Sequence, residues 1–219
     1  MKLLAIDTST EACSAALHVD GETTSRYELA PRRHAELILP MIDNLLSEAQ
    51  LSLKQLDAIG FGRGPGAFTG VRIAAGIAQG LAFSSDLPVI PVSSLAALAQ
   101  AVKDKADYIA AAIDARMEEI YYGLYKSGRI VELTGEECVI TPDKLYIDKT
   151  LKYFGVGSGW SRHKQSLTTL FADQLISFAD DQYPHAADVA TLAIHAYKQG
   201  IMVKPEDALP VYLRNNVTG

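Results

Sequence analysis

The chain has 219 residues, of which 48% are hydrophobic and 21% charged, and its formal net charge is −6. A chain of this length can form one large domain or two smaller lobes without disulfides or metals. The 16 glycines, nine prolines and ordinary charge content exclude a collagen-like, coiled-coil or disordered protein. Because binding of phosphates needs clustered Lys and Arg, the acidic balance argues against a protein that binds nucleic acid through a basic surface of its own.

The amino terminus lacks the pattern of a secretory signal, since the apolar run Leu3–Ile6 ends at Asp7. Uncharged stretches, such as Ile73–Ser85, are shorter than the roughly 20 apolar residues that cross a bilayer. Cys13 and Cys138 form no Cys-x-x-Cys pair. A disulfide between them is one interpretation, but two single thiols are more typical of buried small side chains in a reducing compartment. We therefore expect a cytoplasmic protein without membrane contact.

The first predicted elements are a strand ending at Asp7 and a second strand, Ser14–Val19, after a polar turn. Apolar residues with a period of 3.6 then predict a helix from His34 to Gln50. The same criteria predict a further series: strand Ala58–Gly62, helix Phe68–Ser85, strand Val89–Val92, helix Ser94–Val102, strand Tyr108–Ile113, and helix Ala187–Lys198, which ends at Gly200. Strands that alternate with helices predict an α/β fold whose sheets are covered on both faces.

Two segments of the first half are repeated in the second. Ile6–Glu11 resembles Ile113–Glu118 at an offset of 107 residues, and Ile59–Gly64 resembles Phe154–Gly159 at an offset of 95. The second copy also has a second strand, Ile120–Tyr125. Coincidental hairpins can mimic one such match, but two in the same order favour a duplication. A period of roughly 100 predicts paired lobes, which we place at residues 1–106 and 107–219.

The segment Gly62–Gly70, here called the glycine-rich loop, contains the strongest local signal in the sequence. Its Pro65-Gly66 pair predicts a type II turn. The loop lies between a strand and a helix, where free N–H groups can hold an anion, although a tight turn without a ligand explains the same residues. The absence of a Gly-Lys pair from the sequence excludes a P-loop. Gly62-x-Gly64-x-x-Ala67 matches a dinucleotide fingerprint only loosely.

The predicted helix Phe68–Ser85 contains three glycines, Gly70, Gly76 and Gly80. Each costs about 1 kcal/mol relative to alanine in a helix. Close packing of this helix against the chain's own sheet, or against a partner, would compensate for the cost. Small residues on several faces leave room for both.

The sequence contains no recognised catalytic or metal-binding pattern. No serine lies in a Gly-x-Ser-x-Gly motif. Asp7 and Asp114 each end a predicted strand, where a carboxylate can face a cleft or form a turn. The run Tyr121–Tyr125 is more typical of strand packing than of base stacking, and His34 is more typical of a capping or surface residue than of a ligand. The five histidines show no His-x-x-x-His spacing: His18, His34, His163, His185 and His195.

Three segments together resemble one family: Ile6–Ser9, Gly62–Ile73 and Pro210–Arg214. They are similar to the bacterial tRNA threonylcarbamoyladenosine biosynthesis proteins TsaB (YeaZ), nearly from end to end. The Gly-Pro-Gly-x-Phe-Thr-Gly segment also resembles TsaD, the catalytic relative of that family. Ala67 and Ala74 depart from the family pattern, in which serine and glycine are common at these positions.

The resemblance implies the duplicated actin-like ATPase fold of sugar kinases and Hsp70, with two lobes that each contain a mixed sheet flanked by helices. TsaD binds metal through a His-x-x-x-His pair, and the corresponding residues here are Ser94 and Leu98, which cannot replace two imidazoles. The resemblance thus implies a pseudoenzyme without metal, cofactor or catalytic residues. Its vestigial phosphate loop and cleft would comprise Asp7, Gly62, Gly64, Gly66, Thr69 and Asp114.

The function implied is that of a non-catalytic subunit. It would form a heterodimer with TsaD and, through TsaD, act with the ATPase TsaE to transfer threonylcarbamoyl to N6 of adenosine 37 in tRNAs that read ANN codons. TsaD would make most of the tRNA contacts. The alternative is a stand-alone nucleotide-binding kinase or ATPase that uses Asp7 and Asp114.

The family pairs through its first two helices, which here are His34–Gln50 and Phe68–Ser85. The same surface would support a homodimer when TsaD is absent. The resemblance therefore places the partner interface at small and apolar residues of these helices: His34, Leu37, Ile38, Met41, Gly70, Ile73, Ala74, Gly76, Ile77 and Gly80.

Overall fold

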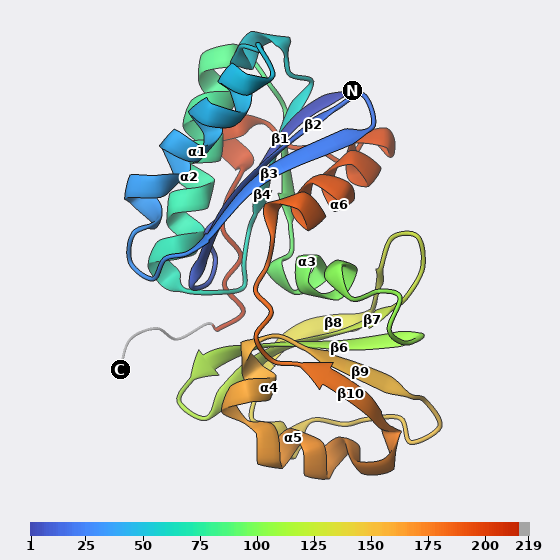
Figure 1. Ribbon diagram of the computed structural model, residues 1–219. Coiled ribbons are helices and arrows are strands. Elements are labelled where there is room, and N and C mark those ends of the chain that lie inside the picture. Colours follow the sequence, from blue (N-terminus) through green and yellow to red (C-terminus); the bar gives the residue numbers. More distant parts are fainter. Residues whose placement is uncertain (215–219) are drawn as a thin grey trace. The chain divides into compact units, whose positions relative to one another are not determined.

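A computed structural model describes residues 1–214 of the chain (Figure 1). Its backbone contacts divide it into two compact units. The first unit consists of residues 1–97 and 184–211, and the second begins with residues 98–183 and continues from residue 212. Each unit is built on one five-stranded sheet.

The first unit contains a mixed sheet with strand order β3-β2-β1-β4-β5. Strand β2 is antiparallel to both of its neighbours, whereas β4 pairs in parallel with β1 and β5. The strands are β1 Lys2–Asp7, β2 Ala12–Val19, β3 Glu22–Leu29, β4 Ala58–Gly62 and β5 Val89–Val92.

Helices cover both faces of this first sheet. Helices α1 (His34–Glu48) and α2 (Phe68–Ser85) lie on one face, over a core that includes Ile6 and Phe61. Helix α6 (Ala186–Lys198) lies on the other face and packs against Leu3 and other buried side chains (Figure 1). The prediction of an α/β fold with both faces covered is confirmed.

The second unit repeats the same strand order, read from its other edge as β10-β9-β6-β7-β8. Helices α4 (Ser158–Arg162) and α5 (Lys164–Phe171) contribute its core, in which Trp160 is fully buried. Helix α3 (Ser94–Ala101) contains the boundary between the two units. The strands are β6 Tyr108–Arg116, β7 Glu119–Lys126, β8 Glu132–Ile140, β9 Tyr153–Val156 and β10 Leu175–Ala179.

The shared strand order confirms the predicted duplication and its two mixed sheets. The connection between the third and fourth strands differs between the copies. In the first copy it contains α1, and in the second it contains only the 3-10 turn η2 (Pro142–Lys144), which agrees with the shorter spacing in the sequence. The remaining 3-10 turns are η1 Leu53–Gln55, η3 Ala172–Gln174 and η4 Pro205–Asp207.

The division into units differs from a boundary at residue 106. Helix α6 belongs to the second sequence repeat, yet its apolar side buries Ala186, Val189 and Ala193 against the first sheet. Burial of apolar surface, and not position in the chain, decides which unit a helix joins. Residues 215–219, at the end of the predicted second lobe, lie outside the described residues.

Within the described part of the chain, no helix has the length and hydrophobicity needed to cross a membrane. Both cysteines are free thiols, with Cys13 buried and Cys138 half-buried. The prediction of buried single thiols therefore holds for Cys13.

Candidate functional site

The glycine-rich loop packs directly against the turn between β1 and β2. The Ala67 N–H donates to the Ser9 carbonyl at 2.7 Å, and the Thr8 hydroxyl donates to the Gly70 carbonyl at 2.7 Å. A Cβ on Gly66 would lie 2.2 Å from the Ser9 oxygen, and one on Gly70 would lie 2.0 Å from the Thr8 oxygen. Two stretches of backbone meet at these positions, so both need glycine.

The turn inside the loop differs from the predicted one. Gly64 has the positive φ of +95°, whereas Gly66 has none, and the Gly64–Pro65 peptide bond is cis. A type II turn centred on Pro65 and Gly66 needs a positive φ at Gly66, so that prediction is wrong. The Gly64 carbonyl accepts a hydrogen bond from the Ser94 N–H at 3.0 Å, and a Cβ on Gly64 would lie 3.1 Å from the Val211 oxygen.

Asp7 ends β1 as predicted and is completely buried. Its Oδ1 accepts hydrogen bonds from the Ser9 N–H at 2.9 Å and the Ser9 hydroxyl at 2.8 Å. Its Oδ2 has no partner among the described residues and occupies the space beside Gly62. Burial raises the pKa of the Asp7 carboxyl to about 6, although the Ser9 hydrogen bonds oppose the shift. A buried carboxyl with a free oxygen is therefore held at the carboxyl end of the strand.

Thr69 is exposed in the first turn of α2, next to this loop. The N-cap residue of α2 is Ala67, which makes no side-chain cap. The first unit thus brings five of the six predicted loop and cleft residues to one region, at the ends of β1 and β4: Asp7, Gly62, Gly64, Gly66 and Thr69.

The sixth predicted residue, Asp114, belongs to the second unit. Strand β6 continues past it to Arg116, so Asp114 does not end the strand as predicted. Its Oδ1 accepts a hydrogen bond from the Arg116 N–H at 3.0 Å, and its Oδ2 lies 3.3 Å from the Arg116 guanidinium. The buried Nε2 of His163 lies 4.0 Å from Oδ1. Asp114 is therefore part of a polar cluster within its own unit, and its joint use with Asp7 stays a prediction.

The predicted interface residues divide into a buried and an accessible set. Five lie on the buried sides of α1 and α2, inside the first unit: His34, Ile38, Met41, Gly70 and Ala74. The other five are half-buried or exposed: Leu37, Ile73, Gly76, Ile77 and Gly80. Only the second set is accessible to a partner.

Gly76 and Gly80 lie on the exposed side of α2, one helical turn apart. A Cβ at either position would meet no atom of residues 1–214 within 4 Å, so packing among these residues requires neither glycine. Together with Phe83 and the η4 residues Pro205 and Glu206, they line a surface pocket of about 350 Å³. Contacts within the described part of the chain therefore do not compensate for the free-energy cost of these two glycines in a helix.

Two aromatic residues that are not among the predicted interface residues lie near the two ends of α2. Phe68 is 48% exposed and Phe83 is 80% exposed. The Arg72 guanidinium lies 3.4 Å from the centre of the Phe68 ring, a cation–π contact. Residues four apart share a helix face. The spacing of Phe68, Arg72, Gly76 and Gly80 therefore places Phe68 on the same face of α2 as the two exposed glycines, and this signal was present in the sequence.

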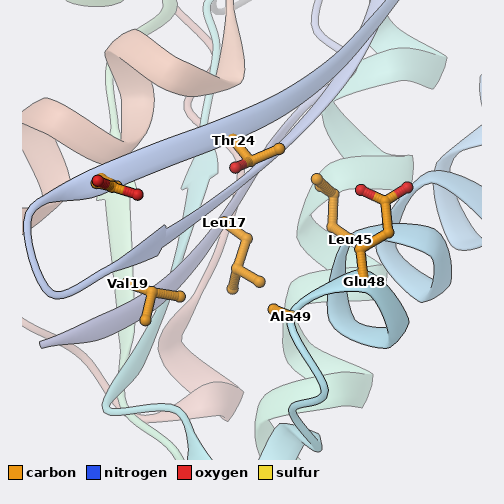
Figure 2. Close-up of a pocket in the computed structure, with 7 residues that line it drawn as sticks. Leu17, Val19, Thr24, Leu45, Glu48 and Ala49 are labelled. Atoms are coloured by element: carbon orange, nitrogen blue, oxygen red, sulfur yellow. The ribbon is translucent and has the colours of Figure 1, made fainter.

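A second pocket, of about 400 Å³, lies between the β2–β3 hairpin and the end of α1 (Figure 2). Its apolar lining is Leu17, Val19, Leu45 and Ala49, and Glu48 is among its polar lining residues. Glu48 forms an ion pair with Arg26 of β3. None of the sixteen predicted site residues lines this pocket, and its polar lining residues Glu22, Thr24 and Glu48 are exposed.

Ser94 and Leu98, the residues that the resemblance matches to a metal-binding histidine pair, are both fully buried on α3. Leu98 packs in the core, and the Ser94 hydroxyl has no hydrogen-bond partner among the described residues. Within residues 1–214, no three His, Cys, Asp or Glu side chains are grouped so that they could hold a metal ion.

Comparison with known proteins assigns the chain to one family. The model of the family "TsaD: tRNA N6-adenosine threonylcarbamoyltransferase" matches residues 23–218. The chain is 44% identical to the tRNA threonylcarbamoyladenosine biosynthesis protein TsaB of Haemophilus influenzae, an alignment that covers all of this chain and 95% of that protein. It is 42% identical to TsaB of Escherichia coli, with 99% of this chain and 96% of that protein covered.

A solved structure gives the same result. YeaZ from Pseudomonas aeruginosa superposes with a TM-score of 0.91 at 46% sequence identity, covering 97% of this chain and 99% of that one. Relatives that match from end to end at this identity share both fold and family. The chain therefore belongs to the TsaB (YeaZ) family, which is related to TsaD.

Proposed function

We propose that this chain acts in the cytoplasm in the biosynthesis of threonylcarbamoyladenosine in tRNA, as a non-catalytic subunit that binds a TsaD-type transferase. The observation that carries the proposal is the full-length identity of 44% to a TsaB protein. In this function, the partner holds the metal and transfers threonylcarbamoyl to N6 of adenosine 37. The ATPase TsaE joins through the partner, and most tRNA contacts are made by TsaD.

The residues at the positions of the TsaD metal pair support a non-catalytic role. A buried leucine cannot bind a metal ion, and one buried hydroxyl is a weak ligand compared with two imidazoles. The net charge of −6 agrees with a subunit that leaves tRNA binding to its partner.

We place the partner contact on the accessible side of α1 and α2. The two exposed glycines of α2 let the backbone of another helix approach closely, which compensates for their cost in the free chain. Phe83 and the pocket beside it supply apolar surface, and aromatic side chains of this kind are frequent hot spots of interfaces. In the absence of TsaD, the same surface supports a homodimer.

The interface placement is tested by binding of the purified chain to its cognate TsaD. Gly76 is exposed, and a Cβ there would meet no described atom within 4 Å, so we expect Gly76→Leu to retain the fold while its side chain points toward a partner. A matched control is Ser166→Leu, an equally exposed position on α5 of the second unit. We expect Gly76→Leu to weaken the complex while Ser166→Leu does not.

The second candidate function is a stand-alone nucleotide-binding kinase or ATPase. The buried Asp7 carboxyl with its unpartnered Oδ2 favours this candidate, because perturbed carboxyls are frequent in catalytic sites. Calorimetry of the isolated chain with ATP and Mg²⁺ distinguishes the two functions. Micromolar binding with turnover, lost in Asp7→Asn, would favour the kinase or ATPase, and no turnover is expected for the subunit.

A further inference from the structure

The turn between β6 and β7 has an unusual backbone. Arg116, Met117 and Glu118 are consecutive and have φ values of +64°, +55° and +60°. The strands pair Arg116 with Glu119, so Met117 and Glu118 form a two-residue hairpin loop. A positive φ at both central residues is the pattern of a type I′ turn, which normally contains Asn-Gly or Asp-Gly.

The β2–β3 hairpin of the same chain shows the usual solution. Its loop is Asp20-Gly21, with φ values of +48° and +109°, between the paired residues Val19 and Glu22. Glycine takes these conformations without steric cost, whereas methionine and glutamate do not. The β6–β7 turn therefore holds a conformation that its own residues do not favour, and other contacts have to maintain it.

Arg214 supplies those contacts. Its guanidinium donates to the Ala115 carbonyl at 3.0 Å and to the Arg116 carbonyl at 3.5 Å, and it forms an ion pair with the Glu119 carboxylate. It also lies 3.7 Å from the sulfur of Met117. Arg214 thus binds residues on both strands that flank the turn, because its planar guanidinium group has several N–H donors in a fixed arrangement.

We propose that Arg214 is a latch, which locks the β6–β7 turn in its left-handed conformation. The latch also positions the Asp114 carboxylate, because the N–H and the guanidinium of Arg116, a residue of the turn, both bind this carboxylate. With Arg214 bound, this carboxylate is held in place. With Arg214 released, the turn relaxes and the carboxylate loses its fixed partner.

Hydrogen exchange of the full-length chain tests the latch. In Arg214→Ala, amides 116–119 should exchange about tenfold faster, while those of the β2–β3 hairpin remain unchanged, since local opening is independent of distant elements. The decisive variant adds Met117→Asn and Glu118→Gly to Arg214→Ala. An Asn-Gly loop favours the conformation by itself, so these substitutions should restore the protection.

Two results would overturn the latch. One is unchanged exchange of amides 116–119 in Arg214→Ala. The other is a failure of the Asn-Gly loop to restore protection, which would mean that Arg214 does not act through the turn conformation. If Arg214→Ala does not fold, Arg214→Lys serves in its place, because lysine keeps the charge opposite Glu119 but cannot bind both carbonyls in a fork. It should give a smaller increase of the same sign.

Discussion

The Asp7 carboxyl fills the space that a side chain on Gly62 would need, since a Cβ on Gly62 would lie 1.8 Å from Oδ2 of Asp7. The last residue of β1 and the last residue of β4 are therefore coupled. The aspartate can be buried there only because the neighbouring strand ends in glycine.

The first prediction concerns this pair. Gly62→Ala should lower the free energy of unfolding by about 1–3 kcal/mol, because the added methyl group overlaps the buried carboxyl and forces a shift. Urea denaturation with circular dichroism measures the change. The double variant Asp7→Ala/Gly62→Ala should lose less than the sum of its two single variants, as expected for residues in contact. Additive effects would contradict the coupling.

Substitution of the exposed glycines of α2 by alanine should stabilise the chain, in contrast to Gly62→Ala. Gly76→Ala and Gly80→Ala should each raise the free energy of unfolding by about 1 kcal/mol, because alanine favours the helix and both sites have free space. Gly70→Ala is the contrasting variant in the same helix. Its Cβ would lie 2.0 Å from the Thr8 carbonyl, so it should be destabilised. Similar changes at all three positions in thermal melts would refute the assignment.

Stability should also depend on the protonation of Asp7. Its pKa is raised from 3.8 to about 6 in the folded chain, so the native state binds the proton more tightly than the unfolded state. The contribution of Asp7 to stability is therefore greatest below pH 4 and falls as the pH rises through 6, by about 3 kcal/mol in total. Asp188, whose pKa burial also raises to about 6, acts in the same direction.

The variant Asp7→Asn isolates this contribution. Asparagine retains an oxygen for the Ser9 hydrogen bonds and carries no charge. The difference in the free energy of unfolding between Asp7→Asn and the parent chain should move in favour of the variant as the pH rises from 4.5 to 7.5. A difference that is constant over this range would show that Asp7 has an ordinary pKa.

Tryptophan fluorescence reports on the second unit alone, because Trp160 is the one tryptophan in the sequence. It is fully buried, stacks on Phe178, and donates its Nε1–H to the Ala110 carbonyl at 2.9 Å. A Cβ on Gly155 would lie 2.3 Å from the indole ring. Gly155→Ala should therefore shift the tryptophan emission to the red and lower the fluorescence-detected midpoint in urea. An unchanged spectrum would contradict this packing.

Much of the fold follows from the sequence. The predicted bounds of β4, α2 and β5 agree with the structure, because each is a strongly apolar or periodic segment that ends at glycine or proline or at a polar turn. The edge strands β3 and β8 were not predicted. No residue of either strand is fully buried and several are polar, so the alternation that identifies a strand is weak.

The candidate interface was harder to predict for a physical reason. Apolar side chains of an amphipathic helix face the core of their own domain, and selection of such residues on α1 gave Ile38 and Met41, which are buried. The side available to a partner carries glycines and single aromatic residues, of which Phe83 was not selected. Sequence periodicity identifies the helix but does not separate a second binding face from the first.

We propose that the exposed glycine face of α2 binds a TsaD-type transferase. The most direct measurement is the affinity of this chain for its cognate TsaD by calorimetry, alongside tRNA modification reconstituted with TsaE. We predict that Gly76→Leu weakens binding by roughly 5- to 150-fold, corresponding to about 1–3 kcal/mol of overpacking, and reduces modification, whereas Ser166→Leu changes neither. Full binding and full modification with Gly76→Leu would contradict the account.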